Sequence, residues 1–258
     1  MVIQALEDMK IGFEAGFAAL DQDQPTLVMI HGAGGSSRTW QGQTFPLNNS
    51  INTIALDLPA HGTTAGEGWS SITEYSKWLI RAINTVFQRP LFLMGHSLGG
   101  AVVQEAALLD SHLMKGIILA GTGPRLPVAP SFLDGLQKDF EGTVDTIMSY
   151  AYSLDADPSL IEEGGKLMKE AGSSVVHSDF LACDRFDVRT RLGEIDLPCL
   201  VLCGDKDKMT PPALSEELNK SIKGSKYKTI PSAGHMLMIE NHKAFNKYVL
   251  DFILETSC

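Results

Sequence analysis

Cysteine, long apolar runs and positive charge are all scarce in this sequence, and each scarcity excludes a class of protein. Only 4 cysteines occur in 258 residues, and the acidic residues 1–10 do not resemble a secretory signal, so we expect reduced thiols and no disulfide framework. No segment approaches the roughly 18 continuous apolar residues that span a bilayer. The sequence therefore predicts a cytoplasmic globular protein that has no membrane partner.

Basic residues are outnumbered, with 21 Lys and Arg against 31 Asp and Glu, which gives a formal net charge of −10 at pH 7. This excess of carboxylates repels phosphate backbones, so we expect no nucleic-acid partner. Nucleotide signatures are also missing. The glycine-rich segment 32–37 does not complete G-x-G-x-x-G because Ser37 occupies the last position, and no G-K-[ST] follows. Cys199 and Cys203 lie about 13 Å apart on a predicted strand, too far to share a metal.

Short apolar runs alternate with longer amphipathic ones along most of the chain. Such alternation predicts crossover connections and a mostly parallel sheet, with the ligand site beyond the carboxyl ends of the strands. The predicted strands are residues 26–30, 51–58, 91–94, 116–120, 200–202 and 227–230. The predicted helices between them are residues 72–87, 98–109, 212–222 and 242–254.

One segment interrupts this alternation. Residues 124–192 contain no clear buried strand, and three helical patterns occur at residues 131–140, 144–153 and 160–171. We interpret the segment as a helical lid inserted into a core that consists of residues 1–123 and 193–258.

The strongest chemical signal is Gly95-His96-Ser97-Leu98-Gly99, between a predicted strand and a predicted helix. In this context the G-x-S-x-G pattern predicts a sharp turn that exposes the hydroxyl of Ser97 as a nucleophile. Without the flanking strand and helix, a G-x-S-x-G pattern carries little information, because Gly and Ser are frequent residues. His96 neighbours the serine and faces away from it if the turn forms.

A serine nucleophile requires a base and a group that orients the base. His235 follows the last predicted strand, on a loop at the same edge of the sheet, and is the candidate base among 7 histidines. Asp205 and Asp207 follow the strand at residues 200–202, and both are candidates for the third member. We prefer Asp207, which lies further along the loop. Without the serine and the histidine, an acidic loop of this kind would be interpreted as a solvated turn.

A glycine-rich turn, His31 to Gly35, follows the first long strand. Backbone N–H groups in such a turn can stabilise an oxyanion, and we predict that the amides of Ala33 and Leu98 form the pair.

Together these motifs resemble the α/β-hydrolase superfamily, in particular its lidded, esterase-like serine hydrolases. The resemblance covers nearly the whole chain: the turn at 31–35, the D-x-P-x-x-G segment at 57–62, the elbow at 95–99, the acid loop at 204–211 and Gly234-His235. It implies a mainly parallel eight-stranded sheet with a helical lid, and a triad of Ser97, Asp207 and His235. The sequence departs from the family at Ala60, where glycine is usual.

The resemblance implies acyl transfer without a metal or cofactor. A carboxylesterase acting on small to medium acyl esters is the leading hypothesis, and thioester hydrolysis and perhydrolysis share its site. We expect a monomer or homodimer whose only other partner is the small-molecule ester. The predicted substrate-binding residues are His31, Gly32, His96, Phe132, Phe140, Met148 and Met236.

Two alternatives remain open at this point. A carbon–carbon bond hydrolase acting on ring-cleavage products has the same triad and usually has a basic lid residue, for which Arg185, Arg189 or Arg191 are candidates. A non-catalytic ligand-binding protein can also be built on this fold and retain the triad.

Overall fold

A computed structural model describes residues 2–257, and its centre is a seven-stranded sheet. The strand order is β1-β3-β2-β4-β5-β6-β7, and only β1 runs antiparallel to its neighbour. All six predicted strands are present, with shifts of a few residues at their ends. The strands are β1 (Phe13–Ala15), β2 (Thr26–Ile30), β3 (Asn52–Leu56), β4 (Leu91–His96), β5 (Met114–Ala120), β6 (Cys199–Gly204) and β7 (Lys226–Ile230).

The expectation of eight strands is wrong for the described residues. The segment before β1 forms a helix, α1 (Val2–Asp8), whose Leu6 is fully buried in the core. These residues pack as a helix against α3 (Ile72–Val86), so they add no further strand at the edge of the sheet.

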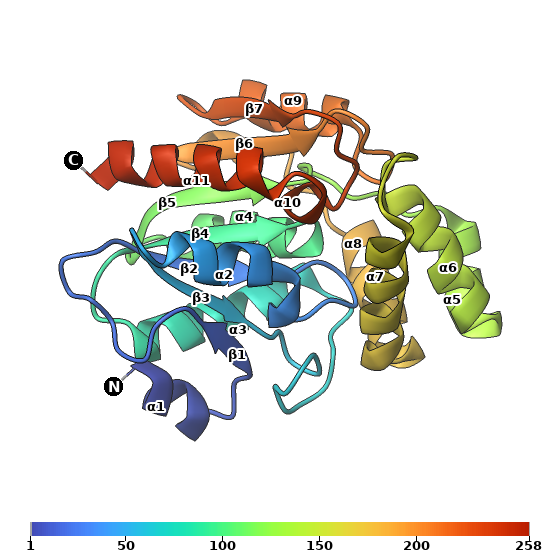
Figure 1. The fold of residues 1–258 in the computed structure, drawn as a ribbon, viewed down its shortest axis with the longest axis horizontal. Coiled ribbons are helices and arrows are strands. Elements are labelled where there is room, and N and C mark those ends of the chain that lie inside the picture. The colour runs from blue at the N-terminus through green and yellow to red at the C-terminus, as the bar shows by residue number, and fades with distance from the viewer. Residues whose placement is uncertain (1, 258) are drawn as a thin grey trace.

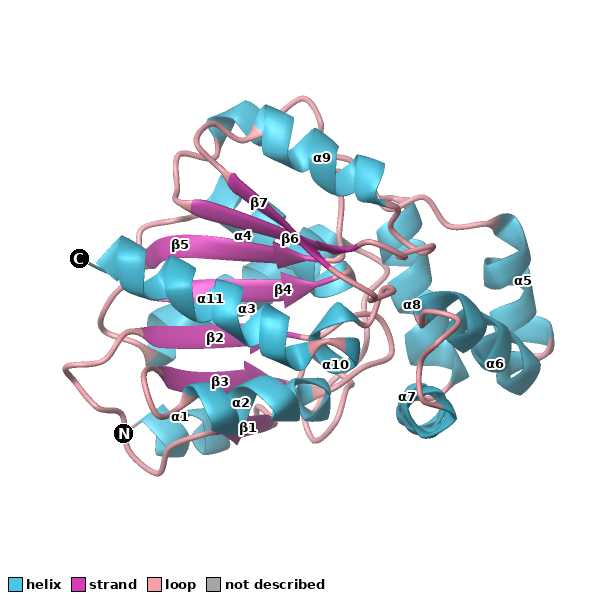
Figure 2. Cartoon of the chain, turned by 45° about the horizontal axis from the view of Figure 1, so that its top comes forward, coloured by secondary structure: helices cyan, strands magenta, loops and turns pink. Residues whose placement is uncertain are grey.

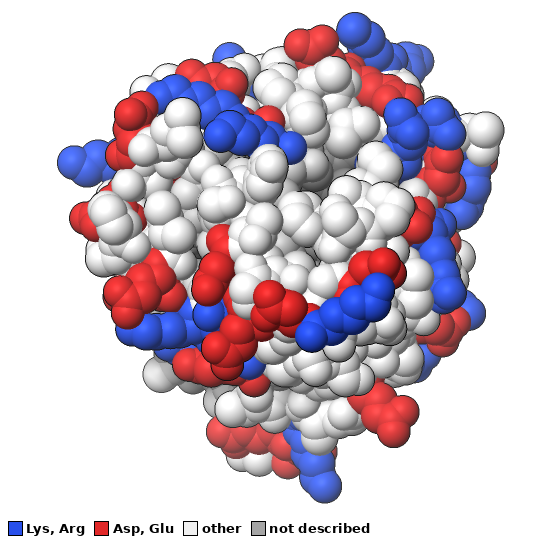
Figure 3. Space-filling model, turned by 90° about the vertical axis from the view of Figure 1, so that its right-hand side faces the viewer, with Lys and Arg blue, Asp and Glu red and all other residues white. Residues whose placement is uncertain are grey.

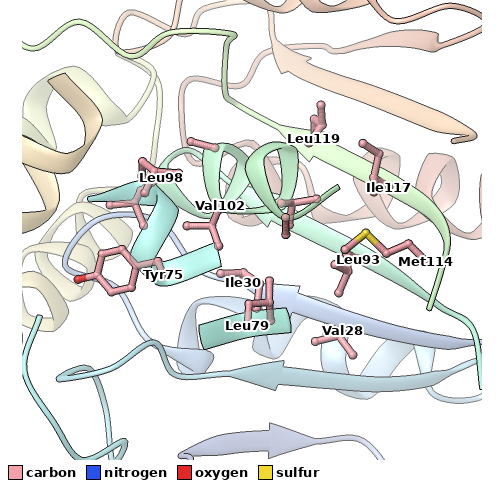
Figure 4. Packing of buried hydrophobic residues seen from close by; sticks show 14 of the residues in the cluster. Val28, Ile30, Tyr75, Leu79, Leu93, Leu98, Val102, Met114, Ile117 and Leu119 are labelled. Carbon is pink, nitrogen blue, oxygen red and sulfur yellow. The ribbon is translucent and has the colours of Figure 1, made fainter. Parts of the chain in front are cut away.

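Helices cover both faces of the sheet (Figure 2). Alternate residues of β2 enter different cores, because side chains of a strand point to opposite faces. Val28 and Ile30 pack towards α1, α3, α4 (Leu98–Leu109) and α9 (Pro212–Ser221), as Figure 4 shows for several of these contacts. Leu27 and Met29 pack towards α2 (Gln41–Leu47), α10 (Leu237–Glu240) and α11 (His242–Ser257). Burial on both faces explains the continuous apolar run in this strand.

Between β5 and β6 the chain forms four α-helices that lie beyond the carboxyl ends of the strands (Figure 1). The sequence predicted three of them. The helices are α5 (Pro130–Lys138), α6 (Phe140–Ala151), α7 (Pro158–Ala171) and α8 (Ser173–Asp184). An isolated bridge between Arg125 and Asp187 joins the two ends of the insertion. We refer to α5–α8 as the lid.

Among residues 2–257, none of the helices combines the length and apolarity that crossing a bilayer requires. Cys183, Cys199 and Cys203 are free and buried. Cys258 lies outside the described residues.

Ala60 adopts the left-handed conformation, with φ 66°. A Cβ there is unfavourable by about 1–2 kcal/mol, and glycine removes this strain but loses about 0.4–1 kcal/mol through the unfolded state. We expect Ala60→Gly to raise the free energy of unfolding by about 0.5–1 kcal/mol in urea denaturation. Ala65 in the same loop has no positive φ, so Ala65→Gly is the matched control and should lower stability. Equal effects of the two substitutions would contradict this account.

Candidate active site

Ser97 occupies a sharp turn between β4 and α4, with φ 52° and ψ −117°. The flanking glycines make this turn sterically possible. A Cβ on Gly95 would lie 2.1 Å from the carbonyl oxygen of Gly99, and one on Gly99 would lie 2.4 Å from that of Ile30. The Ser97 amide donates to the carbonyl of Ala120 at 3.0 Å, which fixes the turn to β5. The next residue begins α4, whose N-terminal amides point towards the same edge of the sheet.

His235 and Asp207 come together from the loops after β7 and β6. The Nδ1 atom of His235 lies 2.9 Å from Oδ2 of Asp207, and both residues are buried. Oδ1 of Asp207 accepts the amides of Met209 and Thr210 at 2.9 and 2.8 Å, and the Thr210 hydroxyl donates to Oδ2 at 2.8 Å. Burial alone would raise the pKa of Asp207, but the charge of His235 and these hydrogen bonds hold the pKa below its usual value. Asp207 is therefore an ionised acceptor that orients the imidazole.

Asp205 has a different environment. Its side chain is exposed, and Oδ1 accepts the amide of Ala233 at 3.2 Å. Of the two candidate carboxylates, only Asp207 contacts His235.

The loop that carries His235 is tied to the end of α6. The amide of His235 donates to the Ala151 carbonyl at 2.7 Å. The carboxylate of Glu240 accepts the amides of Gly234 and Ser153, both at 2.9 Å. The position of His235 thus depends on contacts with the lid as well as on β7.

Ser97 and His235 line the same cavity, between the carboxyl edge of the sheet and the lid. Its volume is about 220 Å³. Most of its lid side chains are apolar, namely Ile147, Met148, Leu160, Leu167, Met168, Phe180 and Cys183. Figure 3 views the molecule from the lid end and shows a hollowed, uncharged centre with acidic and basic side chains interspersed around it.

Four of the seven predicted substrate-binding residues, Gly32, His96, Met148 and Met236, line this cavity. The structure does not place the other three, His31, Phe132 and Phe140, in the lining of this cavity. His31 is fully buried, with Nδ1 bound to the Gly32 carbonyl at 2.8 Å and Nε2 accepting the Leu58 amide at 3.1 Å. The two phenylalanines pack against the lid's own core.

His96 contacts His235 through its Nε2 atom and through its ring. Nε2 of His96 lies 3.0 Å from the His235 carbonyl, and the two rings are 4.6 Å apart. Burial and the neighbouring charge of His235 lower the pKa of His96 to about 3. His96 is therefore neutral and donates from Nε2. Of the two predicted oxyanion donors, Ala33 lines the cavity, and Leu98 is buried at the start of α4, directly after Ser97.

The sequence matches the alpha/beta hydrolase family over residues 27–248. The chain belongs to this family. A solved thermophilic esterase is 30% identical, with a TM-score of 0.82, and the match covers 95% of this chain and 98% of that one. Pimeloyl-[acyl-carrier protein] methyl ester esterase of Neisseria meningitidis is 25% identical over 88% of this chain and 93% of its own length. Polyketide synthase ThaQ of Burkholderia thailandensis is 26% identical over 90% of this chain, which spans only 12% of that protein.

Sequence reasoning missed two groups at this hydrolase site. Thr210 lies between Asp207 and His235, with its hydroxyl 3.1 Å from Nδ1 of the imidazole. Asp179, on the unpredicted helix α8, is fully buried and bonds to His61. Helix α8 mixes polar and apolar residues without a clear stripe, so no pattern marked it. Within residues 2–257, no three side chains of His, Cys, Asp and Glu converge in a way that could hold a metal ion.

His61 of this hydrolase lies where an imidazolium is favoured. Nδ1 is 3.0 Å from the Pro59 carbonyl and Nε2 is 2.8 Å from Oδ2 of Asp179, so both nitrogens face acceptors. Burial by itself lowers the pKa of His61. The charge and hydrogen bond of Asp179, the Pro59 carbonyl and the charge of Asp57 raise the pKa above its usual 6.5. The neighbouring ring of His31, 4.8 Å away, is neutral because burial lowers its pKa to about 3.

A raised pKa in the folded state makes the contribution of His61 to stability pH-dependent. The contribution is complete below pH 6.5 and is lost as the pH rises through the folded-state pKa. We expect the difference in unfolding free energy between wild type and His61→Gln to shrink with rising pH, by up to about 1.4 kcal/mol per pH unit. Urea denaturation between pH 6 and pH 9 would measure it. A difference that stays constant over that range would show that His61 is not charged in the fold.

Proposed function

We propose that this hydrolase is a serine carboxylesterase that cleaves small to medium acyl esters through an acyl-enzyme. The observation that carries the proposal is the hydrogen bond between His235 Nδ1 and Asp207 Oδ2, at 2.9 Å. It holds the imidazole as the Nδ1–H tautomer and leaves Nε2 as the basic nitrogen, in a cavity that Ser97 also lines.

In the proposed reaction the Ser97 hydroxyl attacks the ester carbonyl while His235 takes its proton. The negative oxygen of the tetrahedral intermediate accepts the amides of Ala33 and Leu98. His235 then protonates the leaving alcohol, and a water molecule, deprotonated by the same imidazole, releases the acid. Asp207 remains ionised throughout and stabilises the imidazolium.

The cavity supports an uncharged acyl group as the substrate. Most of the side chains that line it are apolar. Its volume of about 220 Å³ is smaller than the roughly 300–1,000 Å³ of pockets for drug-sized ligands. Methionines contribute several of the lining side chains, and their flexibility allows the cavity to adapt to acyl groups of different shape.

The positions of Arg185, Arg189 and Arg191, which follow α8, favour the esterase over a carbon–carbon bond hydrolase. None of these arginines lines the cavity. Each has a partner outside the cavity instead: Arg185 bonds to Ser70, Arg189 to Asp187, and Arg191 to Glu105. A substrate carboxylate in the cavity would therefore find no cation from this set. Arg38 does line the cavity, but it pairs with the exposed Glu170 at 2.8 Å.

Turnover of a series of p-nitrophenyl esters, from acetate through butyrate and octanoate to laurate, tests the proposal. We expect hydrolysis well above a Ser97→Ala control, with kcat/KM highest for acyl chains of intermediate length. Absence of turnover above that control would refute the esterase function. A preference of several orders of magnitude for a ring-cleavage diketone over every ester would favour the carbon–carbon bond hydrolase.

A further inference from the structure

Asp179 is a carboxylate on lid helix α8 that reaches into the core and has three hydrogen-bond donors there. The Tyr75 hydroxyl of α3 donates to Oδ1 at 2.8 Å. The Gly34 amide and Nε2 of His61 both lie against Oδ2, at 2.9 and 2.8 Å. Asp179 and His61 have no exposed surface. A single lid side chain thus connects three core segments that are far apart in sequence.

One of these donors belongs to the glycine-rich turn after β2. The Gly35 amide donates to the Gly32 carbonyl at 3.0 Å, and Gly34 has φ 62°. Residues 32–35 therefore form a β-turn with a positive φ at its third residue, Gly34. The central peptide of this turn carries the Gly34 N–H, which donates to Asp179. The amides of Gly34 and Gly35 are therefore both engaged within the protein. All four residues of the turn, Ala33 among them, line the cavity.

The lid also packs directly on this turn. A Cβ on Gly34 would lie 2.8 Å from Cγ of Met168 on α7 and 3.0 Å from Cγ2 of Val176 on α8. Lid side chains therefore fill the space on one side of Gly34 while the lid is docked.

We propose that Asp179 is a positioning residue that sets the oxyanion-binding turn, so that docking of α8 on the core and correct placement of the Ala33 amide occur together. The carboxylate accepts the Gly34 amide, holds the central peptide of the turn in one orientation, and thereby orients the preceding peptide, which carries the Ala33 N–H. This inference rests on the proposed esterase function, because it assigns the Ala33 amide to a developing oxyanion.

A role in stability alone explains this arrangement poorly. Desolvating a carboxylate and an imidazolium offsets most of their attraction, and apolar side chains of similar volume often stabilise a fold equally well. Only a group with two acceptor oxygens satisfies the Gly34 amide, His61 and Tyr75 together. Positioning fits a site where a misplacement of about 1 Å lowers the rate about 10²-fold.

Steady-state kinetics of two substitutions at Asp179 separate positioning from charge. Asp179→Ala removes the acceptor for the Gly34 amide, and we expect kcat for p-nitrophenyl acetate to fall about 10- to 100-fold with KM changed less than about threefold. Asp179→Asn retains an oxygen that accepts the same amide, and its kcat should stay within about threefold of wild type. Asp145→Ala is the control, because Asp145 is a lid carboxylate that pairs with Lys169 at the surface.

Amide hydrogen exchange of the wild-type protein supplies a measurement that depends on neither a variant's folding nor the activity. If α8 and the turn move together, the Gly34 amide exchanges with the same opening free energy as the amides of α8. Exchange of Gly34 that is independent of α8 would overturn the inference, as would an Asp179→Ala protein that folds and retains its kcat. A wild type without esterase activity whose Gly34 and α8 open together would refute the proposed function but leave the coupling of lid and turn intact.

Discussion

Replacement of Ser97 by alanine is expected to lower kcat for p-nitrophenyl butyrate by about 10⁴-fold or more, because no other group supplies the nucleophile. Serine and alanine both carry a Cβ, so the substitution does not change the strain of the positive φ, 52°, at this position. The backbone bond from the Ser97 amide to Ala120 is also retained. The melting temperature and the circular dichroism spectrum should therefore match those of wild type.

Ser149→Ala is the matched control for this substitution. Ser149 is an exposed serine of α6 whose hydroxyl donates to the Thr146 carbonyl at 2.6 Å, so its loss should leave kcat within about twofold of wild type, as for most surface changes. If Ser97→Ala retained a tenth of the wild-type kcat, the acyl-enzyme mechanism would be untenable.

Asp207→Asn should have an effect of similar size, about 10⁴-fold on kcat at pH 7. The amides of Met209 and Thr210 require an acceptor at the Oδ1 position, so the oxygen of the asparagine occupies it. The NH₂ group is then directed at Nδ1 of His235 and stabilises the tautomer that carries its proton on Nε2. That nitrogen can no longer accept the proton of Ser97.

Asp205→Asn tests whether this loss is specific to Asp207. Within residues 2–257 the Asp205 side chain accepts the Ala233 amide alone, and an asparagine oxygen serves that contact equally well, so kcat should change less than about threefold. Measuring both variants across pH 5–10 would separate a loss of tautomer control from general damage to the loop. Comparable losses in the two variants would show that the loop matters only as a scaffold.

Local sequence patterns were sufficient to predict most of the core. Apolar runs marked most of the six predicted strands because strands buried on both faces are rich in apolar residues, and β2 illustrates this with alternate side chains in two separate cores. Helices α3 and α4 were predicted almost to the residue from their starts and spacing. Helices α1 and α2 were not, because α1 is only 7 residues long and Pro46 lies inside α2.

At the candidate site, the sequence identified the residue types and the order of the strands that carry them. The strand-to-loop spacing around Ser97, Asp207 and His235 was informative because parallel strands bring their carboxyl ends to one edge. The same argument failed for His31. This residue also follows a strand, but its side chain turns inward and bonds to the backbone of Gly32 and Leu58. Which way a side chain points after a strand depends on neighbours that sequence spacing does not reveal.

The sequence by itself determined the alternation of strands and helices, the elbow around Ser97 and the candidate triad, since each depends on local periodicity or on backbone geometry within a few residues. The docking of the lid was decided only in the tertiary structure. Which lid side chains line the cavity, and the contacts of Asp179 with residues 104, 118 and 145 positions away, arise from packing between distant segments. Such contacts are the sum of many weak interactions that no short stretch of sequence encodes.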